Sequence, residues 1–234
     1  MTDPHDLKSI VKVCMFDQYG TVVDMQTGLV EAATPFLRTK GWQGNANSFV
    51  TWWRRTHFEN SMIDALLHKE HAPYREIGER SVAHVMDRAG IRYTMDEVRA
   101  LVDHIVRLRP FPEVPAALDR LRTRYRLVVL SNGDPDMLED AREHHGIAFE
   151  RVISVAAANS FKPHVATYAK AAEITGVRMG EVLFIANHAF DCIGAKAAGM
   201  RTVFIDRRQR PFGATPHQPD LLVPSMSALA DLIV

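Results

Sequence analysis

The chain has 234 residues with 28 basic and 28 acidic side chains, so its formal net charge is zero. Such a chain has no strong field to attract nucleic acid or an anionic membrane, and we expect neither as a partner. No stretch approaches the roughly 18 continuous apolar residues of a membrane span, and the first residues lack the pattern of a signal peptide. The two cysteines, Cys14 and Cys192, lie in apolar or helical patterns, which favours buried free thiols and a cytoplasmic location.

Short apolar runs alternate with helical patterns along most of the chain. The runs are typical of strands covered on both faces and span residues 11–16, 126–130, 151–155, 182–186, 202–205 and 221–223. The helical patterns between the later runs span residues 114–124, 135–144, 164–175 and 190–198. This alternation predicts an α/β fold with an open parallel sheet and right-handed crossovers.

The interval between the first two predicted strands is long and contains no convincing strand. Its helical patterns span residues 29–40, 47–67, 77–89 and 95–108. We interpret it as a helical cap inserted over the carboxyl ends of the strands, with residues 24–108 as the cap and residues 1–23 and 109–234 as the core domain. Residues 207–219 are rich in Arg, Gln, Gly and Pro and are predicted to form an exposed loop.

Polar residues follow four of the predicted strands, at the edge where open α/β sheets bind their ligands. After the first, second, third and fourth of these strands stand, in order, Asp17, Ser131 with Asn132, Lys162, and Asn187 with His188 and Asp191. Because the carboxyl ends of parallel strands meet at one edge of a sheet, we expect these side chains to form one site.

Five motifs contain these residues. They are F-D-Q-Y-G-T at 16–21, W-R at 53–54, L-S-N-G at 130–133, S-F-K-P-H at 160–164 and N-H-A-F-D-C-I-G-A-K at 187–196. Together they resemble the haloacid dehalogenase superfamily, and within it the L-2-haloacid dehalogenases of type II. The resemblance implies a Rossmann-like core with a helical cap, a small-molecule substrate, no metal or other cofactor, and often a homodimer.

The residue two positions after Asp17 separates two kinds of chemistry. Most of the superfamily transfers phosphoryl groups and has a second Asp there, which protonates the leaving oxygen while Mg²⁺ offsets the crowded negative charge. This chain has Tyr19, a poor replacement for an acid that must also deprotonate water. A halide leaves without a proton, so Tyr19 favours displacement at carbon over phosphoryl transfer.

The resemblance implies a catalytic role for several residues. Asp17 is the nucleophile that forms an ester with the second carbon of the substrate. Lys162 keeps Asp17 ionised and oriented. Asp191 holds the lysine and the hydrolytic water, and Tyr168, six residues after the lysine, lies close to the nucleophile.

Other matching residues are implied to bind the substrate. Ser131 binds its carboxylate, and the Asn132 amide lies beside the leaving halide. Arg54 stabilises the departing halide, with the adjacent Arg55 as the competing choice. The remaining expected substrate contacts are Tyr19, Asn187 and Phe190. Five aromatic residues are candidates for the apolar wall of the pocket, and for each of them plain core packing is at least an equal alternative. They are Phe16, Trp53, Phe58, Tyr74 and Phe190.

The fourth motif departs from the best-known members, which have Ser-x-Asn where this chain has Ala186, Asn187 and His188. In the family the Asn helps to position the hydrolytic water. We hypothesise that His188 orients or deprotonates that water, because histidines usually titrate near neutral pH. The alternative is that His188 only hydrogen-bonds a backbone group.

The sequence therefore predicts a metal-free (S)-2-haloacid dehalogenase that converts small 2-haloalkanoates to 2-hydroxyalkanoates. One alternative is a related hydrolase of a non-halogen acid such as azetidine-2-carboxylate, and another is a magnesium-dependent phosphatase. A non-catalytic binding protein is disfavoured, because the buried charges of Asp17, Lys162 and Asp191 would cost stability without a task.

Overall fold

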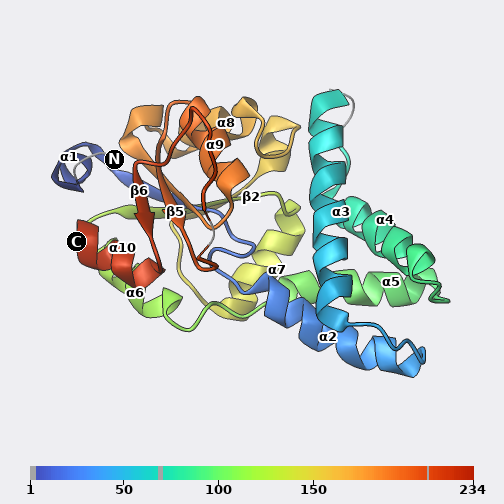
Figure 1. Ribbon diagram of the computed structural model, residues 1–234. Coiled ribbons are helices and arrows are strands. Elements are labelled where there is room, and N and C mark those ends of the chain that lie inside the picture. Colours follow the sequence, from blue (N-terminus) through green and yellow to red (C-terminus); the bar gives the residue numbers. More distant parts are fainter. Residues whose placement is uncertain (1–3, 68–70, 210) are drawn as a thin grey trace.

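A six-stranded parallel sheet forms the centre of the molecule (Figure 1). The computed structural model describes residues 4–67, 71–209 and 211–234. The strands, in chain order, are β1 (Val13–Phe16), β2 (Arg126–Ser131), β3 (Arg151–Ser154), β4 (Val182–Ala186), β5 (Arg201–Ile205) and β6 (Leu221–Val223). Their order across the sheet is β3-β2-β1-β4-β5-β6, so the predicted parallel α/β fold is confirmed.

The strand that precedes Asp17 lies in the middle of the sheet. Every residue of β1 and of its neighbour β4 is buried, as continuous apolar runs require when helices cover both faces. The register places Phe16 beside Val129 of β2 and Ile185 of β4. The backbone N–H of Asp17 still donates to the Ile185 carbonyl (3.0 Å), so the pairing fixes Asp17 at the carboxyl edge.

Helices cover both faces of the sheet. Figure 1 shows α8 (Val165–Thr175) and α9 (Ala189–Ala197) on one side, and α6 (Val114–Arg122) and α10 (Met226–Ile233) on the other. The helix α7 (Pro135–His145) follows β2. These positions agree with the predicted helices except for α10 and α1 (Pro4–Ile10), which the sequence patterns did not indicate because both are short.

The interval between β1 and β2 is helical, as its pattern predicts. It contains α2 (Met25–Thr39), α3 (Ala46–Leu67), α4 (Tyr74–Arg88) and α5 (Met95–Val102), which Figure 1 shows to one side of the sheet. The predicted helix 95–108 is instead α5 followed by a 3₁₀ turn, η1 (Asp103–Arg107). The exact limits of a cap domain, 24 and 108, stay a prediction.

The segment predicted as an exposed loop begins with a residue that is anchored to the core. The guanidinium of Arg207 lies 3.9 Å from the centre of the Phe111 ring and donates to the Thr21 carbonyl (3.1 Å). Arg207 also forms an ion pair with Glu113. The expectation of full exposure is therefore wrong for Arg207, because a stacked and paired guanidinium holds the start of this loop against the core.

Two further expectations concern membrane-spanning helices and the two cysteines. Within the described part of the chain, no helix is long and apolar enough to cross a membrane. Cys14 and Cys192 are both buried and free of disulfides, as their apolar contexts predict.

Candidate active site

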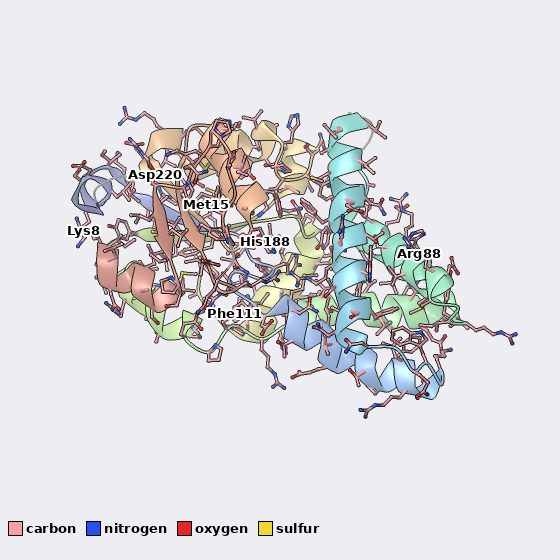
Figure 2. The ribbon with its side chains drawn as sticks, in the orientation of Figure 1. Lys8, Met15, Arg88, Phe111, His188 and Asp220 are labelled. Atoms are coloured by element: carbon pink, nitrogen blue, oxygen red, sulfur yellow. The ribbon has the colours of Figure 1, made fainter. Side chains whose placement is uncertain are left out.

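The polar residues at the strand ends meet at one cavity of about 630 Å³. Its lining comes from the carboxyl edge of the sheet and from helices α2, α3 and α4. Figure 2 shows His188 in the region where the sheet faces these helices. The residues predicted for the site that line this cavity are Asp17, Tyr19, Arg54, Asn132, Lys162, Asn187, His188 and Phe190.

Asp17 is only 6% exposed, and its carboxylate is held through both oxygens. Its Oδ1 accepts a hydrogen bond from Lys162 Nζ (2.8 Å). Its Oδ2 accepts one from Thr21 Oγ1 (2.7 Å) and lies 3.3 Å from His188 Nδ1. Burial alone would raise the pKa of Asp17, but the charge of Lys162 and the contact with His188 bring that pKa below its ordinary value. Asp17 is therefore an ionised carboxylate at neutral pH.

Lys162 is fully buried between two carboxylates. Its Nζ donates to Asp17 Oδ1, to Asp191 Oδ2 (2.7 Å) and to the Leu130 carbonyl (3.0 Å). These three bonds use all of the protons of a lysine ammonium group. Burial would lower the pKa of Lys162, but the two carboxylates outweigh burial and raise it. The ammonium group therefore stays charged and fixed beside Asp17.

Asp191 and Tyr168 lie behind Lys162 rather than in the cavity lining. Both are fully buried, and Tyr168 donates its O–H to Asp191 Oδ1 (2.6 Å). Burial raises the pKa of Asp191, and the charge of Lys162 opposes part of that rise. Tyr168 was expected close to Asp17; the structure connects it to Asp17 through Asp191 and Lys162.

The two residues after Leu130 have different positions. Asn132 lines the cavity, and its Oδ1 accepts a hydrogen bond from the backbone N–H of Lys162 (3.0 Å). This contact turns the amide so that its NH₂ group is available to a ligand. Ser131 is fully buried and outside the cavity lining, and its Oγ accepts from the backbone N–H of Gly133 (3.3 Å). The expected contact of Ser131 with a substrate carboxylate stays a prediction.

His188 faces the carboxylate of Asp17 and not a backbone group. An ionised carboxylate only accepts hydrogen bonds, so Nδ1 of His188 carries the proton in this contact and Nε2 has the lone pair of the neutral ring. Gly20 makes room for the ring: it has φ +90°, and a Cβ there would lie 2.8 Å from His188 Cε1. The neighbouring Asn187 holds this turn by donating to the Gly20 carbonyl (3.0 Å).

Arg54 reaches the cavity from α3. Its Nη1 donates to Gln26 Oε1 (2.7 Å), while its buried Nε has no hydrogen-bond partner among the described residues. Burial, followed by the charge of Arg208, lowers the pKa of Arg54 to about 10. Arg55 also lines the cavity, but it is exposed and pairs with Glu59 (2.7 Å). Of the two candidates, Arg54 is the desolvated one.

Comparison with known proteins decides the family. The family described as haloacid dehalogenase-like hydrolase matches residues 11–199. The chain belongs to this family. It is 30% identical to haloacetate dehalogenase H-2 of Moraxella sp. (strain B), over 95% of this chain and 98% of that protein. It is 32% identical to an (S)-2-haloacid dehalogenase of Xanthobacter autotrophicus, over 85% of this chain and 76% of that protein.

Solved structures of the family have the same fold. An L-2-haloacid dehalogenase from Xanthobacter autotrophicus with chloropropionic acid covalently bound matches with a TM-score of 0.84 at 27% identity. The match covers 95% of this chain and 98% of that one. The resemblance expected from the five motifs is thereby confirmed.

The aromatic candidates for an apolar wall divide into two groups in this haloacid dehalogenase-like hydrolase. Phe58, Tyr74 and Phe190 line the cavity, and the rings of Phe58 and Phe190 are 4.1 Å apart between centroids. Phe16 and Trp53 are fully buried and outside the lining, as core packing predicts. The wall is therefore built from α3, α4 and α9.

Several residues at the cavity were not predicted from the sequence; they are Thr21, Gln26, His57, Arg207 and Arg208. Only Thr21 had a signal, because it closes the F-D-Q-Y-G-T motif. Among the residues that the structure describes, no group of three His, Cys, Asp or Glu is arranged to hold a metal ion. Lys162 occupies the space between the two buried carboxylates, Asp17 and Asp191.

Proposed function

We propose that the protein is an (S)-2-haloacid dehalogenase that hydrolyses small 2-haloalkanoates to 2-hydroxyalkanoates. The observation that carries this proposal is the ionised Asp17, held by Lys162 and Thr21 at the cavity, with Tyr19 where a phosphoryl-transfer enzyme needs a second acid. The names of the relatives support it, since they are haloacetate and (S)-2-haloacid dehalogenases.

In the first step, an oxygen of Asp17 attacks the second carbon of the substrate. A C–O bond forms, the carbon–halogen bond breaks with inversion, and the halide leaves with the bonding electron pair. The Asn132 amide and the desolvated Arg54 stabilise the charge that develops on the halide. The product of this step is an ester of Asp17.

In the second step, water hydrolyses this ester. His188 takes a proton from the water through Nε2 while the water oxygen attacks the carbonyl carbon of the ester. The acyl–oxygen bond breaks, and the departing alkoxide takes the proton from His188 to become the 2-hydroxyalkanoate. Asp17 then releases the second water proton to the solvent, because Lys162 favours its ionised form.

Halide release tests this function. The purified protein is mixed with chloroacetate or with racemic 2-chloropropionate in the presence of EDTA, and Asp17→Asn is the control. We expect release by the wild type alone, stopping when half of the racemate is consumed. No release from either substrate would refute the proposal and make azetidine-2-carboxylate and, with magnesium, phosphate esters the next substrates to test.

Two further properties are part of the proposal. A cytoplasmic location is supported by the two buried free thiols, since disulfides are rare in reducing compartments. A homodimer remains a prediction from the family resemblance, and the molar mass in solution tests it.

A further inference from the structure

The cavity has a surplus of positively charged side chains. The charged residues that line it are the cations Arg54, Arg55, Lys162, Arg207 and Arg208 and the acids Asp17 and Asp24. A haloacetate itself carries one negative charge, that of its carboxylate. The pairing of each cation shows which of them are available to a ligand.

Three of the five cations are already paired within the protein. Lys162 lies between Asp17 and Asp191, Arg207 pairs with Glu113, and Arg55 pairs with Glu59. The acid Asp24 has a different task, since its Oδ1 accepts the backbone N–H of Thr27 (3.1 Å) at the start of α2.

The remaining two cations, Arg54 and Arg208, form no ion pair with a carboxylate among the described residues, although the charges of Asp24 and Asp17 act on Arg54. Arg54 bonds only to the neutral amide of Gln26, and its buried Nε has no partner. Arg208, in the exposed segment after β5, forms no hydrogen bond or ion pair within the described part of the chain. Two guanidinium groups at one cavity repel each other unless an anion lies with them, and guanidinium groups bind carboxylates in a bidentate manner.

The cavity also has room for more than a two-carbon acid. A volume of about 630 Å³ lies in the range of pockets that enclose drug-sized ligands, and chloroacetate would fill a small part of it. The substrate therefore has space for a side chain at the second carbon that extends toward an unpaired guanidinium.

We propose that the preferred substrates carry a second anionic group beyond the second carbon, that is, 2-halodicarboxylates such as (S)-2-chlorosuccinate. Arg208 binds the distal carboxylate, and Arg54 keeps its place beside the departing halide. The bonds that form and break are those of the proposed function, on which this inference rests, and the product is a 2-hydroxydicarboxylate. Arg208 is a specificity-determining residue and takes no part in the chemistry.

A matched pair of substrates isolates the distal charge. In one, (S)-2-chlorosuccinate, the distal group is a carboxylate; in the other it is the corresponding amide, which has nearly the same shape and no charge. For an exposed charge pair we expect kcat/KM to favour the carboxylate by about fivefold, mainly through KM, and the preference to shrink as salt is added.

Variants then assign the preference to one residue. Arg208→Gln is expected to lower kcat/KM for (S)-2-chlorosuccinate about fivefold more than for the amide or for chloroacetate, which brings the ratio of the matched pair close to one. Arg88→Gln removes an equal charge at the far end of the cap (Figure 2) and is expected to keep the preference. The inference fails if the wild type does not distinguish the two substrates, or if Arg208→Gln lowers all three substrates equally.

A binding experiment separates this inference from the proposed function. Succinate and its monoamide are compared as stabilisers of the wild type against heat, because a ligand that binds the folded state raises Tm. If neither chloroacetate nor 2-chloropropionate releases halide, the proposed function is wrong, and the two Tm shifts then decide the inference alone. A larger shift with succinate that Arg208→Gln abolishes supports it, and equal shifts overturn it.

Discussion

Lys162 shows how one buried residue organises the chemistry of its neighbours. Its ammonium group touches both Asp17 and Asp191, yet the two carboxylates respond differently: the pKa of Asp17 falls below its ordinary value and that of Asp191 rises. The difference follows from their other partners. Asp17 also faces His188, which lowers its pKa further, whereas Asp191 is fully enclosed and lies near the negative charge of Asp17. One carboxylate is thus exposed to substrate, and the other supports the lysine.

At the same scale, His188→Asn tests the assignment of the base. The asparagine side chain has no lone pair that can take a proton from water, so we expect the ester of Asp17 to form at nearly the wild-type rate and to be hydrolysed about 100-fold more slowly. The ester should then accumulate, and the mass of the intact protein after mixing with 2-chloropropionate measures it. An ester that accumulates no more in the variant than in the wild type would exclude His188 as the base.

At the scale of elements, the side chain of Asp134 connects α7 to the start of α4, which forms part of the cavity wall. Asp134 stands at the start of α7, directly after the S-N-G motif, but its carboxylate does not cap that helix. It accepts instead the backbone N–H groups of Tyr74 (2.8 Å) and Arg75 (2.9 Å), at the start of α4. Tyr74 lines the cavity, and its ring stacks on Tyr19 with centroids 5.7 Å apart. The position of this wall therefore depends on a contact between α7 and α4.

Asp134→Ala should loosen that wall. Two N–H groups at the start of α4 lose their acceptor, which typically costs about 1–2 kcal/mol of stability at a helix start. We expect KM for 2-chloropropionate to rise more than kcat falls, because the chemistry at Asp17 is untouched. Urea unfolding and steady-state kinetics measure the two effects.

The matched control for this prediction is Asp136→Ala. Asp136 pairs with the side chain of Arg75 at the surface, and among the described residues it accepts no backbone N–H group of α4. Its loss should change stability and KM little, since exposed ion pairs contribute about 1 kcal/mol or less. Equal effects of the two substitutions would contradict the role given to Asp134.

At the scale of the whole molecule, the sequence predicts those site residues whose positions follow from the topology of the parallel sheet. Asp17 and Asn132 follow apolar strands, so their convergence is a consequence of the topology. The contacts that were missed join distant segments without a local pattern: Thr21 Oγ1 accepts the Asn187 N–H from 166 positions away, and Arg54 bonds to Gln26 on another helix. Arg208 belongs to a segment whose composition indicates only a loop. Side chains that complete a site from outside the strand ends are visible only once the chain is folded.

The stability of the whole molecule should also depend on pH through His57. This residue is a buried side chain of α3, its Nε2 lies 3.0 Å from the Tyr74 carbonyl, and its ring stacks on Tyr74 with centroids 3.9 Å apart. Burial lowers the pKa of His57 from 6.5 to about 3. Between these two values the unfolded chain binds a proton at this position and the folded protein does not. The contribution of His57 to the free energy of unfolding is therefore present in full above pH 6.5 and is lost as the pH falls from 6.5 toward 3.

His57→Phe removes the group that binds this proton and keeps an aromatic ring at the position that stacks on Tyr74. One proton corresponds to about 1.4 kcal/mol per pH unit. Between pH 6 and 4, the slope of the free energy of unfolding against pH should therefore be smaller in the variant than in the wild type by about this amount. Urea unfolding at several pH values measures it. The control is His84→Gln on the exposed face of α4, which should keep the wild-type slope. If His57→Phe and the wild type lose stability in parallel, the buried imidazole is not the group that binds the proton on unfolding.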